Sequence, residues 1–572
     1  MEKINKLKNI FKSEKIDGYI IPKNDEFFGE YIPDYKDRLK YISNFTGSYG
    51  FALILDNKNY LFVDGRYTLQ ANKQCGKFFS IKTIPHELPQ KVLKNKKLQI
   101  GFDPKLFTKK SLKIFFGKTS CKYVPLNNNL IDKIWIRKKR ISKKKFYILP
   151  KISIGESYKS KINKIVNKLK KNQADCQFIT ASENNAWLFN IRGNDTKFTP
   201  IPHSHVLIDN KKNINFFCDL NKISNSFRKI FSKVKFININ NIETILSKIY
   251  KKKVIIDKNT CSIFYENFIF KNNEILNQQD PIYALKAVKT KKEINNIKNA
   301  HIYDGAALTK YLFWLKNNFL KKKITEISAE KRLLSFRKKN KNFNFLSFPT
   351  ISGTGPNGAI IHYKATKKSN RKLKKGDIYL VDSGGQYNYG TTDVTRTISL
   401  DNSSKRIKNI FTRVLKGHIA VANFNLKKNT TGSMIDTNAR KYLREINLDY
   451  AHGTGHGVGY FLNVHEGPHA ISKSNTVNFQ EGMIVSNEPG YYEKNNFGIR
   501  IENLIYVKKN KQKNYFDNLT MAPIDKTLID IKMLNKVEKK WLNNYHKKVF
   551  DNLKKFMNKS EILELDKSCS AI

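Results

Sequence analysis

The sequence lacks any run of about 18 consecutive apolar residues, the shortest stretch that typically spans a membrane as a helix. Residues 1–22 also lack the apolar centre of a secretory signal peptide. Instead, Ile4, Leu7, Ile10 and Phe11 follow helical spacing, which predicts the first helix of a folded domain. These absences predict a protein with no membrane partner.

Cysteine is scarce and scattered. The six cysteines form no CxxC pair, which argues against a cysteine-based zinc site and against a disulfide scaffold. Free thiols are typical of a reducing compartment. We therefore expect a cytoplasmic protein.

Acidic residues are few relative to basic ones, with 48 Asp and Glu against 106 Lys and Arg, so the formal net charge is +58. A charge of this size can indicate nucleic-acid binding. However, the excess is mostly lysine, it is spread over separate segments, and it accompanies abundant asparagine and isoleucine, as an AT-rich coding sequence would favour. Compositional drift is therefore preferred over a specific nucleic-acid site, although salt-sensitive, nonspecific binding to polyanions is expected.

The hydrophobic content of 40% is ample for folded cores. Strand-like segments at 17–22, 50–56 and 60–66 alternate with helical ones, and the last two segments are spaced as a hairpin. A similar order begins again near Ser153, with a helical segment at 157–172. This weak internal repeat predicts two related α/β domains, residues 1–140 and 150–285, joined by a basic linker near 136–146.

A third domain of alternating helices and strands is predicted at residues 286–510, followed by a helical extension at 511–572. Its expected helices are 324–338, 404–424 and 432–446, and its expected strands are 378–382, 395–400, 483–486 and 498–507. In the extension, one helical face carries Val537, Trp541, Tyr545, Val549 and Leu553. Such a face predicts packing on the third domain or on a partner. The fold class is therefore α/β (α+β).

The third domain contains five residues that could bind metal, namely Asp382, Asp393, His456, Glu488 and Glu502. Four converging carboxylates would repel one another without a cation, and together they carry enough charge for two divalent ions. Asp382 ends an apolar strand and Asp393 precedes the next, so antiparallel pairing would place both on one face. Taken alone, such a pair is more often turn chemistry, but the three later residues favour a metal site.

Histidines gather in glycine-rich loops of the same domain, at positions 362, 452, 456 and 465. The run HGTGHGVG resembles a nucleotide-binding fingerprint, but it neither follows a clear strand nor opens a helix. The orientation of Glu502 stays open, because strand alternation places Arg500 and Glu502 on one face without indicating whether that face is buried.

Several motifs together resemble one known family. GTGPNGAIIHY, VDSGGQYNYGTTDVTRT, HGTGHGVGYFLNVHEGP, NEPGYYE and FGIRIEN are similar to those of the pita-bread metallopeptidases, and in particular to the long, three-domain, cytosolic aminopeptidase P group. Flanking motifs such as EYIPDYKDRLKYISNFTGSYG and NAWLFNIRGND extend the resemblance over nearly the whole chain. The resemblance implies two creatinase-like N-terminal domains before a pita-bread catalytic domain. One departure is TPIPHSHVLI, where His203 and His205 have no assigned role.

The resemblance also implies functional roles. Asp382 is expected to bind one metal, Asp393 and Glu502 to bridge two metals, and His456 and Glu488 to complete the second site, with manganese as the usual ion. Glu488 is expected to handle a proton. The remaining implied roles belong to residues that contact substrate or orient ligands: His362, His452 and His465 on the substrate, and Arg500 beside ligands such as Asp393, with lesser weight on Tyr387 and Thr395.

The expected activity is release of the N-terminal residue from peptides with proline in second position, by a homodimer. Two alternatives are weighed. A prolidase restricted to dipeptides is disfavoured by the two preceding domains, and a non-catalytic binding module is disfavoured because all five expected ligands are present.

Overall fold

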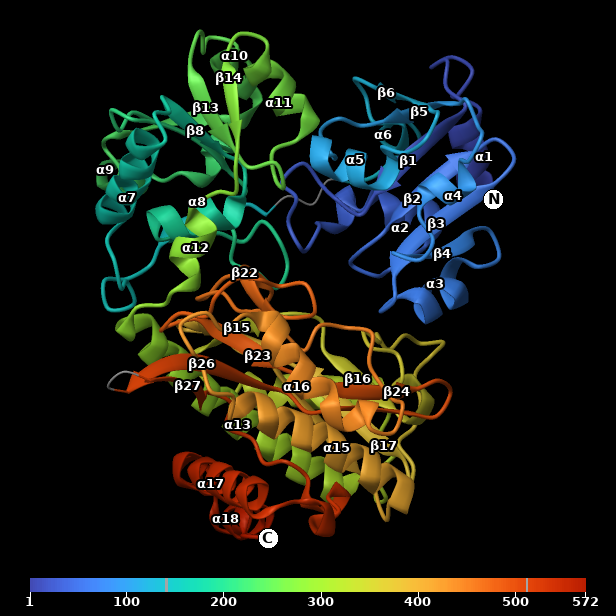
Figure 1. Ribbon diagram of the computed structural model, residues 1–572, viewed down its shortest axis with the longest axis vertical. Coiled ribbons are helices and arrows are strands. Elements are labelled where there is room, and N and C mark those ends of the chain that lie inside the picture. Colours follow the sequence, from blue (N-terminus) through green and yellow to red (C-terminus); the bar gives the residue numbers. More distant parts are fainter. Residues whose placement is uncertain (139–141, 511–512) are drawn as a thin grey trace. The chain divides into compact units, whose positions relative to one another are not determined.

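The computed structural model describes residues 1–138, 142–510 and 513–572, which fold into two compact units, Met1–Tyr283 and Ala284–Ile572 (Figure 1). The predicted basic linker near 136–146 lies partly outside the described residues. Within the described ranges, no helix combines the length and apolar character needed to cross a membrane.

The first unit contains two six-stranded sheets with the same topology, in the orders β4-β3-β2-β1-β5-β6 and β12-β11-β10-β8-β13-β14. In each sheet a central strand pairs antiparallel with one neighbour and parallel with the other: β1 with β2 and β5, and β8 with β10 and β13. The internal repeat predicted from sequence is therefore confirmed. The strands are β1 Gly18–Pro22, β2 Phe51–Leu55, β3 Asn59–Asp64, β4 Ser80–Ile84, β5 Gln99–Phe102, β6 Lys122–Pro125, β8 Cys176–Ile179, β10 His205–Asp209, β11 Ile214–Cys218, β12 Val234–Asn238, β13 Lys253–Ile256 and β14 Glu274–Asn277, with β7 Tyr147–Ile148 and β9 Ile191–Arg192 paired separately.

Short helices pack around these sheets. The predicted helix at 157–172 is confirmed as α7: the Ser157 side chain caps its first turn, and Ile162, Ile165, Val166 and Leu169 form its buried stripe. The helices of this part of the chain are α1 Glu2–Lys8, α2 Arg38–Ser43, α3 Thr68–Cys75, α4 Pro89–Val92, α5 Lys109–Phe116, α6 Leu130–Ile134, α7 Tyr158–Lys171, α8 Ser182–Phe189, α9 Asn225–Ile230, α10 Ile242–Leu246, α11 Ile263–Phe270 and α12 Ile282–Ala287, the last crossing the boundary between the units.

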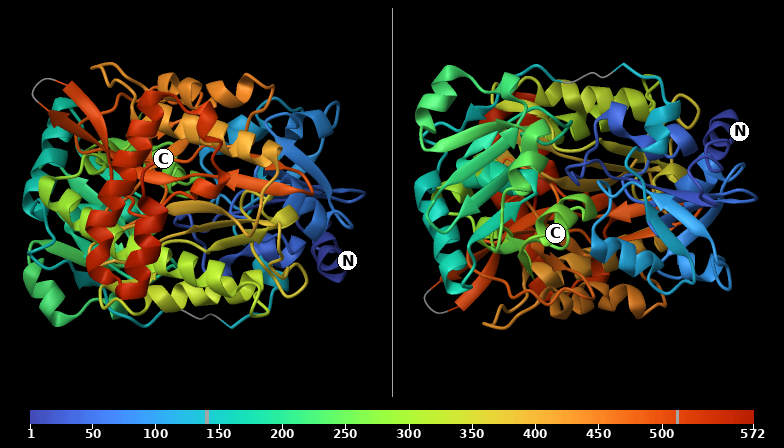
Figure 2. Two further views of the ribbon diagram at one scale, coloured as in Figure 1. Left: turned by 90° about the horizontal axis from the view of Figure 1, so that it is seen from below. Right: turned by 90° about the horizontal axis from the view of Figure 1, so that it is seen from above.

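The second unit places pairs of helices on opposite sides of its strands. Figure 2 shows α15 (Lys405–Ala422) and α16 (Gly432–Arg444), in orange, on one side, and α13 (Lys291–Asn318) and α14 (Glu326–Arg337), in yellow-green, on the other. α13 begins at a capping box in which Thr290 and Glu293 exchange hydrogen bonds. The helices predicted at 324–338, 404–424 and 432–446 are confirmed as α14, α15 and α16.

The strands between these helices form several small sheets, two of which, β16-β17-β20 and β22-β21-β23-β26-β27, carry proposed ligands. One predicted strand is wrong. Residues 498–507 do not form one continuous strand. They belong to two strands in different sheets, β25 and β26, and Ile501 and Glu502 lie between them outside either strand. The strands are β15 Phe343–Leu346, β16 Ile351–Thr354, β17 Ile378–Ser383, β18 Gly385–Tyr387, β19 Gly390–Thr391, β20 Val394–Ser399, β21 Gly455–Gly457, β22 Glu466–Ile471, β23 Ile484–Asn487, β24 Gly490–Glu493, β25 Phe497–Arg500, β26 Asn503–Asn510 and β27 Lys513–Asn518.

Within the second unit, the C-terminal extension packs on the preceding helices through α17 (Lys536–Leu553) and α18 (Lys559–Cys569). Tyr545, Val549 and Leu553 share one apolar cluster with residues of α15, as the sequence pattern predicts. Val537 departs from that pattern and is 66% exposed, because it lies in the first turn of α17, beyond the packed surface.

Candidate metal centre

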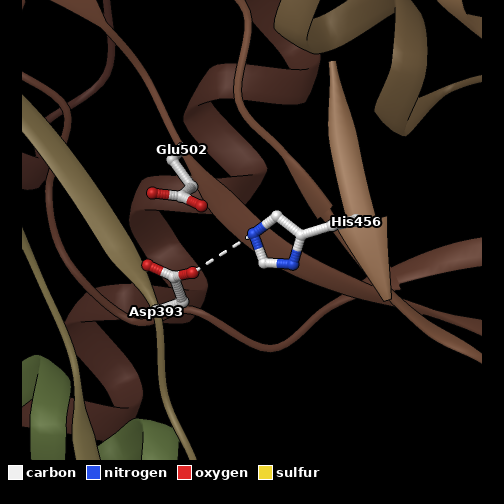
Figure 3. A group of neighbouring side chains, drawn as sticks. All are labelled: Asp393, His456 and Glu502. Atoms are coloured by element: carbon white, nitrogen blue, oxygen red, sulfur yellow. Dashed lines mark ion pairs between the residues drawn. The ribbon is translucent and has the colours of Figure 1, made fainter. Parts of the chain in front are cut away.

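Three potential ligands from distant parts of the sequence meet in the second unit (Figure 3). Asp393 directly precedes β20, His456 lies in β21, and Glu502 lies between β25 and β26. One ligand atom from each residue lies within 4.8 Å of the other two, and the Asp393 carboxylate is 3.4 Å from Nε2 of His456. This spacing suits three donors around one ion.

Glu488 and Asp382 extend this group. Glu488 Oε1 lies 3.5 Å from Nε2 of His456. Asp382 lies in β17 opposite Thr395 of β20, which confirms the predicted antiparallel pairing. Asp382 Oδ1 is buried and has no hydrogen-bond partner among the described residues. An orphaned buried carboxylate oxygen is expected where a metal ion supplies the missing partner.

Local sequence explains how the backbone reaches this arrangement. A Cβ atom at Gly455 would lie 1.8 Å from the carbonyl oxygen of Ser486, so glycine is required for β21 to approach this neighbouring chain segment. The break at Glu502 turns its side chain inward, and only 2% of the residue is exposed. The question that strand alternation left open is thereby answered: Glu502 is buried.

The carboxylates are electrostatically destabilised by one another. Burial, followed by the charges of Asp382 and Glu488, holds the pKa of Asp393 well above its ordinary range. Burial and then the Asp393 charge do the same to the pKa of Glu502, and the pKa of Glu488 is also raised, chiefly by burial. Protons or cations must offset such a cluster at neutral pH. The set of hard oxygen donors with one imidazole fits divalent ions such as manganese.

Polar groups behind the ligands fix their orientation. Thr395 Oγ1 donates to Glu502 Oε2 at 2.7 Å, and Ser486 Oγ donates to Glu488 Oε1 at 3.0 Å. His456 Nδ1 lies 3.0 Å from the carbonyl oxygen of Gly457, so a proton on Nδ1 leaves Nε2 free to bind an ion. Thr395, for which the sequence predicts only a lesser role, thus contacts a proposed ligand directly.

Arg500 contacts a proposed ligand, as the resemblance implies, but that ligand is Asp382. Its Nη2 donates to Asp382 Oδ2 at 2.6 Å rather than to Asp393, and its Nε donates to Thr395 at 3.0 Å. Its Nη1 donates to the hydroxyl of Tyr492 at 2.6 Å. The sequence placed Arg500 near the centre but could not select among carboxylates that lie on different strands.

Two of the three auxiliary histidines lie beside the proposed ligands. The rings of His465 and His456 lie 4.2 Å apart, and His452 Nδ1 lies 4.0 Å from Glu488 Oε2. His362 is half-buried in the loop between β16 and β17. Sequence reasoning missed Tyr492, whose hydroxyl lies 2.8 Å from Nε2 of His452 and whose position in NEPGYYE, four residues after Glu488, was the available signal.

Tyr387 and the two unassigned histidines, His203 and His205, contact residues other than the proposed ligands. Tyr387 is buried and donates its hydroxyl to Asp304 at 2.8 Å. In the first unit, His203 and His205 stack on Phe27, with ring centroids 4.1 and 5.2 Å away. Burial lowers the pKa of His205 to about 4 and that of His203 well below its ordinary value, so both are neutral packing residues.

Family models cover almost the whole described chain. A model described as metallopeptidase family M24 matches residues 295–509, and a model of the C-terminal region of these peptidases matches 514–572. Models of the creatinase/prolidase N-terminal domain match residues 3–134 and 137–293. A fungal relative from Laccaria bicolor, called a probable Xaa-Pro aminopeptidase P, is 38% identical over 96% of this chain and 90% of its own length. The chain belongs to metallopeptidase family M24.

Other relatives of this M24 protein agree along the full length. The Xaa-Pro aminopeptidase 1 of Dictyostelium discoideum is 36% identical over 98% of this chain and 94% of its own. Among solved structures, the X-prolyl aminopeptidase of Caenorhabditis elegans, described as a cytosolic enzyme with a di-nuclear active site, is 30% identical. It matches 100% of this chain and 99% of its own with a TM-score of 0.95. The resemblance inferred from the motifs is therefore confirmed.

Proposed function

We propose that this M24 protein is a metal-dependent aminopeptidase that releases the N-terminal residue from peptides with proline in second position. The observation that carries the proposal is the convergence of Asp393, His456 and Glu502 in a chain similar to Xaa-Pro aminopeptidases over its full length. The similar C. elegans structure, with its di-nuclear active site, supports a site for two ions.

In this proposal Asp382, Asp393, His456, Glu488 and Glu502 bind two divalent ions, with manganese as the natural choice for oxygen-rich donors. When bound, such ions polarise the scissile carbonyl and lower the pKa of an attacking water. Glu488 is assigned to hold the proton that this water loses, because its carboxylate lies in the cluster, 3.5 Å from Nε2 of His456.

The histidines give the site its means of binding a peptide. His465 packs against His456, and His452 lies beside Glu488, so both can donate hydrogen bonds to a substrate carbonyl near the ions. His362 is assigned to the same task of holding the peptide, and Arg500 to orienting the ligands through Asp382. An X-Pro bond lacks an N–H and its ring fixes φ, so selectivity requires a pocket that accepts the ring, which we place beside His465.

Several finer features belong to the same proposal. We infer a cytoplasmic homodimer, supported by the cytosolic description of the C. elegans enzyme for the location and by family resemblance for the dimer. We also divide the chain into creatinase-like domains at 1–140 and 150–285, a catalytic domain at 286–510 and an extension at 511–572, divisions supported by the separate family models.

A cleavage assay tests the proposal. Purified protein with added manganese is expected to release arginine from Arg-Pro-Pro-type tripeptides, and His456→Ala is expected to lose this activity. Cleavage of X-Pro dipeptides alone would favour a prolidase. Absence of both metal and cleavage, together with base-specific RNA binding that persists at roughly 0.2 M salt, would favour a non-catalytic binding module.

A further inference from the structure

Helix α16 carries a buried ion pair beside the loop that holds His452. Arg440 Nε donates to Asp436 Oδ2 at 2.7 Å, one helical turn away. Arg440 is 2% exposed and Asp436 is 1% exposed. Neither residue belongs to the metal centre described above, and the sequence motifs gave no sign of either.

Arg440 donates hydrogen bonds to three residues of the loop. Its Nη1 donates to Asp449 Oδ1 at 2.7 Å and to the carbonyl oxygen of Tyr450 at 2.8 Å. Its Nη2 donates to the carbonyl oxygen of His452 at 2.6 Å. The guanidinium also lies 3.9 Å from the centre of the Tyr450 ring. A planar group with several fixed N–H donors can satisfy all these acceptors at once, whereas the single ammonium of lysine cannot.

Asp436 holds the same loop beyond His452. Its Oδ1 accepts a hydrogen bond from Thr454 Oγ1 at 2.6 Å. The carbonyl oxygen of Thr454 in turn accepts from the backbone N–H of Glu488 at 2.8 Å. The ion pair therefore fixes the chain on both sides of His452 and ties it to the segment that carries Glu488.

The imidazole of His452 depends on this anchored backbone for its place in the site. Its ring lies 4.8 Å from that of Tyr450, which Arg440 also contacts. On the other side, its Nε2 lies 2.8 Å from the Tyr492 hydroxyl. Reacting groups displaced by about 1 Å can lose about a hundredfold in rate, so the position of this backbone matters for the reaction.

We propose that Arg440 and Asp436 form a positioning pair that sets His452 for the peptidase reaction. The inference rests on the proposed function, and it adds two residues that act through the backbone of His452 rather than by touching the ions or the peptide.

The test compares Arg440→Lys with Arg444→Lys in the full-length, manganese-loaded protein. Arg440→Lys is expected to lower kcat for an Xaa-Pro tripeptide about tenfold or more while leaving KM and the bound metal content unchanged, because the ligands are untouched. Arg444 lies one turn further along α16 and also contacts Asp449, at 3.1 Å, but its side chain is 42% exposed. Its variant is expected to keep the wild-type kcat within about twofold.

A double-mutant cycle separates positioning from general damage. In a His452→Ala background, Arg440→Lys is expected to cause no further loss, because its effect acts through the missing imidazole. An undiminished loss in that background, or a parallel fall in metal content, overturns the positioning role. If Arg440→Lys does not fold, Asp436→Asn takes its place in the same cycle and is judged by the same two results. An inactive wild-type protein would refute the proposed function and the positioning role with it, whereas an active wild type with fully additive losses refutes the positioning role alone.

Discussion

Two of the buried acidic sites in the second unit balance their negative charge in opposite ways. Glu466 is 5% exposed and lies between two buried lysines, with Lys289 Nζ at 2.6 Å and Lys286 Nζ at 3.2 Å. Asp393 and Glu502 are buried to a similar degree, yet their nearest charged neighbours are mainly other carboxylates. The Glu466 site has two lysines for one carboxylate, whereas among the described residues the cluster of Asp382, Asp393, Glu488 and Glu502 has the single guanidinium of Arg500.

The difference appears in the pKa values. Burial raises the pKa of Glu466, but the charges of Lys286 and Lys289 outweigh it, so the pKa falls below the ordinary value. Burial and neighbouring acids act in the same direction on Asp393 and Glu502, so both pKa values rise. A buried acid with fixed cations is a structural ion pair, whereas buried acids without them are a binding site for external cations.

The largest effect is expected when a proposed ligand is removed from the cluster of Asp382, Asp393, Glu488 and Glu502, here called the unpaired cluster. Asp393→Asn should reduce aminopeptidase activity by about a thousandfold or more, because an ion that contributes several kcal/mol to the transition state is lost or displaced. The same change should raise the melting temperature of the metal-free protein, since it removes one repelling charge. Steady-state kinetics and thermal melts measure the two effects, with the exposed Asp401→Asn as control. A lower melting temperature for metal-free Asp393→Asn would contradict this prediction, because it would mean that neighbouring groups already compensate the carboxylate charges.

Removing the carboxylate charge of Glu466 from its two lysines should have the opposite consequence for stability. Glu466→Gln leaves Lys286 and Lys289 buried without an anion, which costs about 3–5 kcal/mol in free energy of unfolding. Denaturant melts of the second-unit transition measure this loss, and Glu481→Gln, at an exposed position, is the control. If Glu466→Gln were as stable as the control, the two lysines would not need their anion and the contrast between the sites would fail.

Metal should stabilise the unpaired cluster only. Manganese at about a hundred times its dissociation constant is expected to raise the free energy of unfolding by about 2.7 kcal/mol, and a chelator should reverse the change. Glu466→Gln should keep the metal-induced shift from its lower baseline, whereas Asp393→Asn should lose most of it. Calorimetry with and without chelator distinguishes these outcomes, and an equal shift in both variants would contradict the assignment of the ligands.

The sequence predicts much of this fold because its periodic signals are local. The buried stripe of α7 and the cap of its first turn all lie between Ser157 and Leu169, and the hairpin of β2 and β3 is set by one short turn. Glu502 shows where such reasoning stops. Alternation assumes a continuous strand, but the chain leaves one sheet at Arg500 and enters another at Asn503, a change imposed by tertiary packing.

In the candidate site, too, local motifs could be interpreted from the sequence, whereas contacts set by tertiary packing could not. The five proposed ligands could be selected from the sequence because the motifs around them are specific, and they stay a prediction. The partner of Arg500 could not be selected, since it depends on which strand lies opposite. Arg440 and Asp436 were invisible for another reason. Arg440 donates to backbone carbonyls of a loop, such as that of His452, and any loop offers such acceptors regardless of its side chains. Asp436 accepts from the Thr454 hydroxyl, and one threonine in a loop gives no signal by itself.

The smallest effect, per pH unit, is the response of the metal-free protein to pH. The ordinary pKa values of Asp393 and Glu502 are 3.8 and 4.5, and the folded values are higher. Above pH 4.5 the folded state therefore holds more protons than the unfolded state, so stability falls as pH rises toward the folded pKa values. Each excess proton contributes a slope of about 1.4 kcal/mol per pH unit.

Melts of the metal-free protein between about pH 5 and pH 7 should show this decline, and Asp393→Asn should flatten it. Glu466→Gln should keep the wild-type slope there, because Glu466 is ionised in both states above its ordinary value of 4.5 and its own contribution is lost only below it. Saturating manganese should flatten the wild-type slope as well, since the ions replace the protons that the carboxylates share. A slope that persists in Asp393→Asn would place the excess protons outside the cluster, on other buried groups of the chain.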